Sequence, residues 1–211
     1  MNVAILGTGP VGDALTKGFL KYGHQVMRGS RDLTKLEPWK DSCRIGSSAE
    51  AAAWAEVIVL AVKGSAAEAV LEQAGHANLA GKVIIDTTNP IADAKPDHGV
   101  LRYFTEANES LMERLQAKVP AARFVKAFNS VGNAFMVDPK FTEGRPTMFI
   151  CGNDAGAKAD VTKIVEQFGW GVADMGDAPG ARPIEALCQL WCIPGLRGGG
   201  WAHAFAWLGL G

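Results

Sequence analysis

The sequence lacks the features that mark membrane, secreted and nucleic-acid-binding proteins. Its longest uninterrupted apolar run is VIVLAV at 57–62, far short of the roughly 20 residues that a membrane-spanning helix needs. The N-terminal MNVAILGTG has no basic segment, and Asp13 follows closely, which is not the pattern of a signal peptide. The formal net charge of -1 gives no attraction to nucleic acid or to an anionic membrane. We therefore expect a cytoplasmic protein with no nucleic-acid and no membrane partner.

Cysteine is also scarce, and its spacing matches no metal or redox motif. Only Cys188 and Cys192 lie close together, and a three-residue gap on a predicted helix fits neither a zinc ribbon nor a CxxC motif. The other two cysteines are Cys43 and Cys151. The histidines show no mutual spacing typical of a metal site: His24, His76, His98 and His203. We expect buried free thiols in a reducing compartment and no bound metal.

Glycine, in contrast, is abundant at 25 of 211 residues, and short apolar runs alternate with segments of helical period. NVAIL at 2–6 predicts a strand, and Val11, Leu15 and Phe19 recur every four residues in a helix that Gly23 ends. Further strands are predicted at 24–30, 43–47, 57–62, 82–90, 123–129, 147–152 and 170–176. Further helices are predicted at 48–56, 65–75, 109–118 with Asn108 as N-cap, 155–168 and 181–211, and a loop at 92–107.

This alternation predicts an α/β fold: a Rossmann-type, doubly wound, mainly parallel sheet with helices on both faces and a small helical C-terminal part.

The first loop of this fold, GTGPVG, has the GxGxxG spacing directly after a strand and at the start of a helix, as a dinucleotide-binding loop requires. Gly7 permits the tight turn, Gly9 lets the backbone approach a pyrophosphate, and Gly12 allows close helix-strand packing. The helix N-terminus, with Pro10 at its start, offers free N–H groups to the phosphates.

An acidic residue is missing where the second strand ends. NAD-preferring sites hold the ribose 2′-OH there with a carboxylate, which would repel the 2′-phosphate of NADP. This chain has RGSR at 28–31 instead, and Asp32 follows only after the strand has ended. Ser30 can donate to a phosphate oxygen, Arg31 can bridge two of them or stack on the adenine, and Lys35 adds a flexible charge. We therefore predict NADP(H) as the cofactor.

Together with VLAV at 59–62, IIDTTNP at 84–90 and FVKAFNSV at 124–131, these residues resemble the NADPH-dependent oxidoreductases of the deazaflavin coenzyme F-420. They also resemble the cytosolic part of membrane metalloreductases that pass electrons from NADPH through a flavin. The similarity covers nearly the whole chain, and its most specific pieces are the glycine loop and the corner formed by Ser30, Arg31 and Lys35.

The resemblance implies further cofactor contacts. Thr8, Pro10 and Val11 would join the pyrophosphate loop. Two segments would flank the ribose and nicotinamide: Ala61, Val62 and Lys63, and Thr88, Asn89 and Pro90. The chain departs from the F-420 enzymes in AFNSVGNA, where Asn129 and Gly132 stand in place of a His and a Pro near the deazaflavin.

We divide the chain into an NADP-binding Rossmann domain at 1–138 and a small C-terminal α/β segment at 139–211. The segment is expected to pack on the domain and to supply an acceptor site, a dimer contact or both. Hydride transfer to a flavin-like ring needs positioning more than acid-base chemistry, so no catalytic residue is assigned. Asn129 and Ser130 are the acceptor-side candidates, because they end a strand at the carboxyl edge of the sheet.

Other polar and aromatic side chains are candidates for catalytic or structural roles. Lys63 and Lys126 are given no catalytic role, because lysines at strand ends are usually solvated, and Asp86 is expected to order its own turn. Trp191, Trp201 and Trp207 lie close together near the end of the sequence. They predict either a lid that stacks on a flat acceptor or a subunit interface, where Trp is enriched. We favour the interface and expect a homodimer.

The sequence thus predicts an NADPH-dependent oxidoreductase that transfers a hydride between NADP(H) and a small-molecule acceptor, either F-420 or a flavin such as FMN or FAD. β-Hydroxyacid dehydrogenases and imine reductases need a long all-helical second domain, and too few residues follow FNSV to form one. A catalytically silent NADP(H)-binding redox sensor or regulatory module is the alternative from another class.

Overall fold

The predicted parallel sheet is present in the computed structural model, which describes residues 1–209. Six strands pair in the order β3-β2-β1-β4-β5-β6, and every pairing is parallel. They are β1 (Asn2–Leu6), β2 (Gln25–Gly29), β3 (Arg44–Gly46), β4 (Val57–Leu60), β5 (Val83–Asp86) and β6 (Arg123–Lys126). This is the strand order of dinucleotide-binding Rossmann folds, so the predicted fold class is confirmed.

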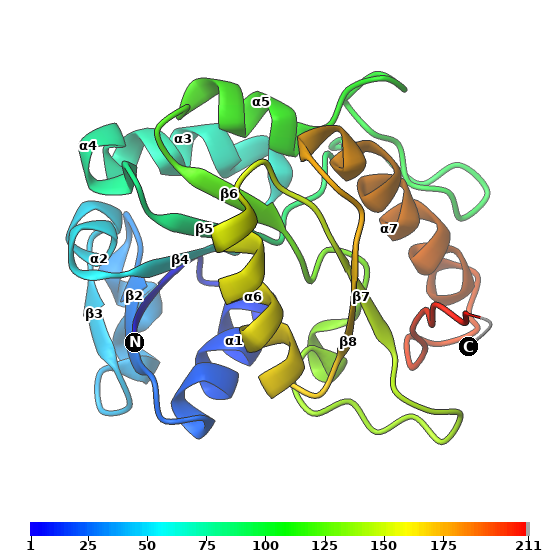
Figure 1. The fold of residues 1–211 in the computed structure, drawn as a ribbon, viewed down its shortest axis with the longest axis horizontal. Helices are drawn as coiled ribbons and strands as arrows, with labels where there is room; N and C mark the ends of the chain where they lie inside the picture. The colour runs from blue at the N-terminus through cyan, green and yellow to red at the C-terminus, as the bar shows by residue number, and fades with distance from the viewer. Residues whose placement is uncertain (210–211) are drawn as a thin grey trace.

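Helices cover both faces of this sheet (Figure 1). They are α1 (Pro10–Lys21), α2 (Ser48–Trp54), α3 (Gly64–Ala74), α4 (His76–Leu79), α5 (Leu111–Lys118), α6 (Ala155–Gln167) and α7 (Ala181–Leu196). Short 3₁₀ helices are η1 (Leu33–Trp39), η2 (Asn133–Phe135) and η3 (Ala178–Gly180). Successive side chains of β1 point to opposite faces: Val3 and Ile5 join the core under α1 and α6, whereas Ala4 and Leu6 join the core under α2, α3 and α5.

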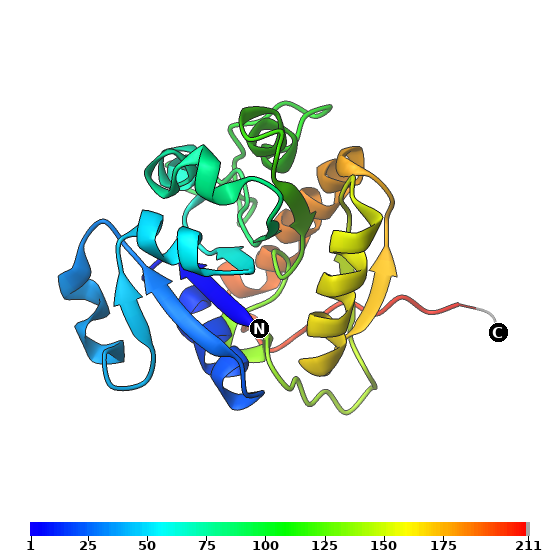
Figure 2. The ribbon, with the colours of Figure 1, turned by 60° about the vertical axis from the view of Figure 1, so that its left-hand side comes forward.

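A second, two-stranded parallel sheet follows along the chain, formed by β7 (Thr147–Ile150) and β8 (Gly171–Asp174). Figure 2 shows α6 and β8 side by side, next to the main sheet. The backbone N–H of Lys126 at the end of β6 donates to the carbonyl of Cys151, and Val161 and Ile164 of α6 pack in the same core as β1. The C-terminal segment therefore shares its core with the Rossmann sheet.

Two helix ends differ from the sequence predictions. The N-cap of α5 is Ser110, not Asn108, because Ser110 and Glu113 form a reciprocal capping box. Helix α7 ends at Leu196 instead of continuing through the segment predicted at 181–211. Pro194 lacks an N–H, and Gly198 and Gly200 adopt left-handed backbone angles that terminate helices. Leu210 and Gly211 of that prediction lie outside the described residues.

The remaining sequence predictions concern membranes and thiols. Within residues 1–209, no helix combines the length and the apolar character needed to span a bilayer. All four cysteines are free thiols.

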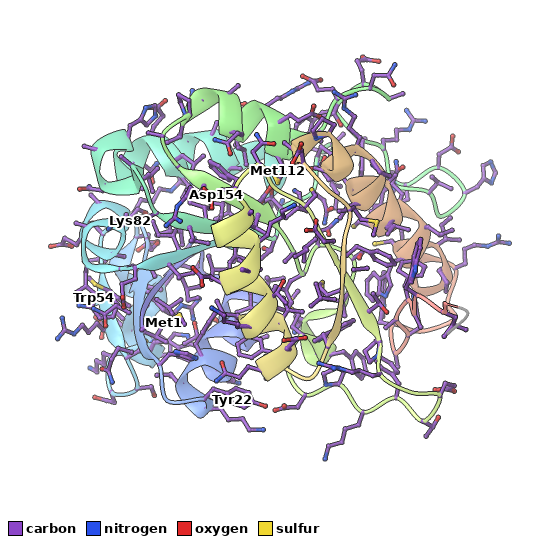
Figure 3. The ribbon with its side chains drawn as sticks, in the orientation of Figure 1. Met1, Tyr22, Trp54, Lys82, Met112 and Asp154 are labelled. Carbon is purple, nitrogen blue, oxygen red and sulfur yellow. The ribbon has the colours of Figure 1, made fainter. Side chains whose placement is uncertain are left out.

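The end of α1 is held by Asp138, whose carboxylate accepts hydrogen bonds from Lys21 and Tyr22. Tyr22 is labelled at the lower edge of Figure 3. These two donors hold the pKa of Asp138 below its ordinary value of 3.8. Asp138 has a left-handed backbone, φ 51°, which Asn also tolerates, so Asp138→Asn keeps the backbone but removes the charge and one of the two acceptor oxygens.

We expect Asp138→Asn to lower the free energy of unfolding by about 1 kcal/mol at neutral pH. Because the pKa of Asp138 is lowered in the folded state, this contribution is present above pH 3.8 and is lost as the pH falls through the folded-state pKa. Urea unfolding of both proteins at a series of pH values checks this. A stability difference that stays constant down the series would contradict it.

Candidate functional site

The carboxyl ends of β1, β4, β5 and β6 meet at one edge of the sheet, and each continues into a loop that carries predicted site residues. From β1 the sheet continues through β2 to β3 on one side and through β4 and β5 to β6 on the other. The strand order therefore changes direction beside β1. In open α/β sheets this reversal point forms the crevice that binds ligands. The geometry therefore places the candidate cofactor site at the end of β1.

The glycine loop fits tightly against the neighbouring strand. Gly7 has a φ of +141°, and a Cβ added there would lie 2.0 Å from the carbonyl oxygen of Ala61. At Gly12 an added Cβ would lie 3.1 Å from the Gly7 carbonyl oxygen. At Gly9, which is the N-cap of α1, an added Cβ would meet nothing within 4 Å. Gly7 is thus required by the protein itself and Gly12 leaves little room for a side chain, whereas Gly9 leaves open space at the helix N-terminus.

This difference predicts distinct effects of two alanine substitutions. Gly7→Ala should lower the free energy of unfolding by about 2 kcal/mol or more, because it combines backbone strain with a clash against Ala61. Gly9→Ala should leave stability nearly unchanged but weaken NADPH binding, because its methyl group occupies the space that a pyrophosphate would approach. Thermal unfolding and NADPH titration of both variants check this. Equal stability losses in the two variants would argue against it.

Arg28, the first residue of RGSR, does not belong to the exposed basic corner. Its side chain is fully buried, and its guanidinium donates from Nη2 to the carbonyl oxygen of Gly7 at 2.7 Å and pairs through Nη1 with Asp13 at 2.5 Å. The guanidinium carbon also lies 4.6 Å from the ring centroid of Trp39. Arg28 therefore fastens the glycine loop to β2 and η1 from inside the protein.

The other residues of the corner lie around one cavity. A cavity of about 180 Å³ is lined by the glycine loop, by the end of β2 and by α3; its lining includes Gly7, Thr8, Ser30, Arg31, Lys35, Ser48 and Val62. Arg31 and Lys35 are exposed, and Ser30 is half-buried. The structure thus brings the pyrophosphate loop and the three predicted 2′-phosphate ligands together at one site.

Asp32 also lines this cavity. Its carboxylate caps η1 and accepts hydrogen bonds from the backbone N–H and the hydroxyl of Thr34. The hydrogen bond from the Thr34 hydroxyl, above all, lowers the pKa of Asp32. The Lys35 ammonium lies 3.9 Å from the same carboxylate. The acid of this corner is therefore engaged by its own helix turn and is partly neutralised by Lys35.

The loops after β4 and β5 contact each other beside the cavity. An added Cβ at Gly64 would lie 2.0 Å from the carbonyl oxygen of Asn89, so the start of α3 presses against the 88–90 turn. Ala61, Thr88 and Pro90 are buried, Val62 and Asn89 are half-buried, and Lys63 is exposed. Of these, Val62 lines the cavity. Their assignment to the nicotinamide half stays a prediction.

A buried charge network that the sequence does not predict lies under these loops. The sequence predicts a solvated Lys126, but the residue is fully buried, and its ammonium lies 2.7 Å from Asp86 and 2.7 Å from Glu185 of α7. It also donates to the carbonyl of Thr88 at 2.9 Å. Burial alone would lower the pKa of Lys126, but the attraction of the two carboxylates outweighs it and raises that pKa.

The partners of Lys126 extend this network to both sides. Asp86 accepts hydrogen bonds from the backbone and hydroxyl of Thr88, so it orders its own turn as the sequence predicted. Glu185 accepts the backbone N–H groups of Leu111 and Met112 at the start of α5. The network thus connects the 86–90 turn, β6, α5 and α7. The apolar neighbours of Lys126 in FVKAF are the signal in the sequence that indicates a buried strand.

Asn129 is fixed by a reciprocal amide pair. Its Nδ2 donates to Asn89 Oδ1 at 3.0 Å and to the carbonyl of Ile184 at 2.8 Å, and Asn89 donates back to the carbonyl of Asn129 at 2.8 Å. Asn129 Oδ1 is buried without a hydrogen-bond partner in the described part of the chain. The preceding Phe128 has a left-handed backbone with φ 61°, a strained conformation that often marks functional sites.

The C-terminal tryptophans divide into two places. Trp191 of α7 is buried and lies against Gly132, where an added Cβ would be 3.2 Å from its ring. Trp201 packs 5.4 Å from the Trp191 ring, centroid to centroid. Trp207, in contrast, lies edge-on to Phe149 of β7 and is 64% exposed. Trp191 and Trp201 therefore adjoin the 129–132 loop, whereas Trp207 extends along the second sheet.

Comparisons with known proteins agree with this geometry. Residues 2–90 match the family model of coenzyme F-420-dependent NADP oxidoreductases. The crystal structure of a protein from Arthrobacter sp. FB24, assigned as an F-420-dependent NADP reductase, has a TM-score of 0.90 and 32% sequence identity, with 98% of each chain covered.

Two further matches have lower sequence identity and cover less of the matched protein. The metalloreductase STEAP3 of Rattus norvegicus is 29% identical over 92% of this chain, which spans only 38% of that relative's length. A reductive aminase from Aspergillus terreus, solved with NADPH, has a TM-score of 0.69 at 20% identity and shares the fold. The match to the Arthrobacter protein covers nearly the whole chain, and its 32% sequence identity shows that the two proteins belong to one family. The chain belongs to the family of coenzyme F-420-dependent NADP oxidoreductases, and it is an NADP-dependent oxidoreductase.

Proposed function

We propose that the protein binds NADPH at the end of β1 and uses it to reduce a flavin-like or deazaflavin acceptor of the F-420, FMN or FAD type. The observation that carries the proposal is the cavity that joins the glycine loop to Ser30, Arg31 and Lys35. Two exposed cations and a hydroxyl at the end of β2 match a 2′-phosphate, and the one acid there is engaged by Thr34.

The residues fit the parts of the cofactor in order. The glycine loop, with Thr8, Pro10 and Val11, would hold the pyrophosphate at the N-terminus of α1, where open space remains above Gly9. The segments Ala61–Lys63 and Thr88–Pro90 would flank the nicotinamide and its ribose, and the Lys126 network holds the second segment in place. When bound, NADPH supplies the hydride.

The acceptor side of the proposal is the 129–132 loop with Trp191 and Trp201. The sequence predicts a strand through Asn129, but β6 ends at Lys126, so Asn129 and Ser130 lie in the loop that follows it at the same edge of the sheet. The indole of Trp191 contacts this loop at Gly132. An aromatic wall beside a strand end suits a flat ring system, which binds by stacking. These residues would bind and orient an acceptor, so the proposal requires no acid or base.

The experiment is an anaerobic acceptor panel. NADPH oxidation is followed at the nicotinamide absorbance band with F-420, FMN, FAD and a ferric chelate as separate acceptors. The proposal predicts turnover that saturates with F-420 or with a flavin. NADPH binding without turnover on F-420, FMN or FAD would contradict it, and turnover on the ferric chelate alone would move the acceptor class to metal ions.

We further propose that the protein is a homodimer. Large apolar side chains are exposed on α7 and the segment after it: Leu190, Leu196, Trp201, Trp207 and Leu208. Exposed aromatic and aliphatic groups of this kind are enriched at subunit interfaces. Analytical ultracentrifugation should give the mass of two chains, and a monomer at all concentrations would contradict the proposal.

A further inference from the structure

Helix α7 holds two thiols in direct contact, and the proposed reaction uses neither. The sulfur atoms of Cys188 and Cys192 lie 3.9 Å apart, one helical turn from each other. Both residues are buried, in a cluster with Trp191 to which Leu101 and Phe205 also contribute. Figure 1 shows the loop between β5 and α5 beside this helix.

The pair is poorly placed for a disulfide. Residues four apart on a helix have Cβ atoms roughly 5–6 Å apart, whereas a disulfide requires about 3.5–4.5 Å. Closing the bond would therefore require the last turns of α7 to unwind. A bridging metal ion has no such requirement, because two metal-thiolate bonds of about 2.3 Å each span up to about 4.6 Å.

The number of available ligands indicates which ions the pair can bind. Within residues 1–209, no group of three or more His, Cys, Asp and Glu side chains is arranged to hold a metal. Zinc in protein sites almost always takes four ligands, so two thiols alone do not satisfy it. Copper(I) and silver(I) are soft ions that accept two thiolate ligands. We propose that Cys188 and Cys192 form a two-thiolate binding site for a soft monovalent cation, Cu(I) or Ag(I).

The protonation chemistry of the pair supports this site. The two sulfurs share a hydrogen bond, and this contact lowers the pKa of Cys192 and raises that of Cys188. Binding of a monovalent cation to both sulfurs releases their protons to solvent and leaves a two-thiolate complex with a single negative charge.

Charged and polar groups around the pair are consistent with a site of net charge −1. The contact with Cys192 and burial raise the pKa of Cys188, and the positive charge of Lys126 acts in the opposite direction. The carboxylate of Glu185, the nearest acid on α7, is already neutralised by Lys126 at 2.7 Å and by the start of α5. Among these neighbours, no unpaired carboxylate lies beside the sulfurs to bind the cation in their place.

The test is a binding titration of the reduced full chain with Ag(I), read by native mass spectrometry, and with Cu(I) against a chromogenic copper(I) chelator under anaerobic conditions. Wild type should retain one ion per chain. Cys188→Ser and Cys192→Ser should each weaken binding by roughly 100-fold or more, since they remove a direct ligand. Cys43→Ser is the matched control, because Cys43 is a lone and more accessible thiol, and it should bind like wild type.

NADPH binding by all four proteins serves as the fold control. Wild type that retains no ion against the chelator would overturn the proposal. Unchanged binding by either Cys188→Ser or Cys192→Ser, with the loss appearing in Cys43→Ser, would also overturn it. Ion binding with the expected variant pattern supports the site whether or not any acceptor is reduced, so its outcome is separate from that of the proposed function.

Discussion

Replacing Lys126 with Met should lower the free energy of unfolding by about 3–5 kcal/mol, the typical cost of removing one partner from a buried ion pair. The ammonium of Lys126 lies between the buried carboxylates of Asp86 and Glu185. Without it, two negative charges face each other in the protein interior. The Thr88 carbonyl also loses its donor, so the 88–90 turn should loosen and NADPH binding should weaken in the same variant.

Denaturant unfolding measures this effect. Lys82→Met is the matched control, because Lys82 precedes the neighbouring strand β5 and donates only to backbone carbonyls of α2. Lys82→Met should lower the free energy of unfolding by about 1 kcal/mol. The double variant Lys126→Met with Glu185→Gln should lose less stability than the sum of its single variants, since the second change removes one of the unpaired charges. Wild-type stability in Lys126→Met would contradict the network.

Replacing Arg31 with Ala should weaken NADPH binding about 100-fold and leave NADH binding nearly unchanged. A charge-assisted hydrogen bond contributes about 1.5–3 kcal/mol, and about 1.4 kcal/mol corresponds to a tenfold change in affinity. Arg31 is exposed at the cavity beside Ser30 and Lys35, so its guanidinium is available to a phosphate. NADH has no group that would use it.

The dissociation constants of both cofactors are measured by titration for wild type, Arg31→Ala and Arg28→Met. Arg28→Met is the informative comparison, because Arg28 holds the Gly7 carbonyl from inside and makes no contact specific to a 2′-phosphate. It should weaken NADPH and NADH binding equally. Equal losses for the two cofactors in Arg31→Ala would show that Arg31 does not bind the 2′-phosphate.

The sheet and the glycine loop could be predicted because local patterns determine them. β1, β4 and β5 are short, mainly apolar runs next to segments of helical period, and GTGPVG follows β1 and opens α1 in the structure. The need for glycine at Gly7 is likewise predicted by the local motif, although Ala61, whose carbonyl oxygen an added Cβ would meet, lies just after β4. Such local patterns are enough to predict the fold without knowledge of the side-chain contacts.

The errors at Lys126 and Arg28 have a common physical cause, namely hydrogen-bond and ion-pair partners that are distant in sequence. Lys126 is buried because Asp86 and Glu185 meet it from two other elements, 40 and 59 residues away. Arg28 turns inward because the Gly7 carbonyl and Asp13 lie behind β2, which its own neighbours in RGSR do not reveal. The overlong C-terminal helix has a different origin, since the apolar content after 196 favours helix while Gly198 and Gly200 end it.

The central claim is that the corner formed by Ser30, Arg31 and Lys35 binds the 2′-phosphate of NADPH. Isothermal titration of adenosine 2′,5′-bisphosphate and adenosine 5′-monophosphate tests it most directly, because both ligands contain the adenine half alone and differ by this one phosphate. The account predicts that the bisphosphate binds about 100-fold more tightly, with an advantage that shrinks as salt is added. Equal affinities for the two nucleotides would contradict it.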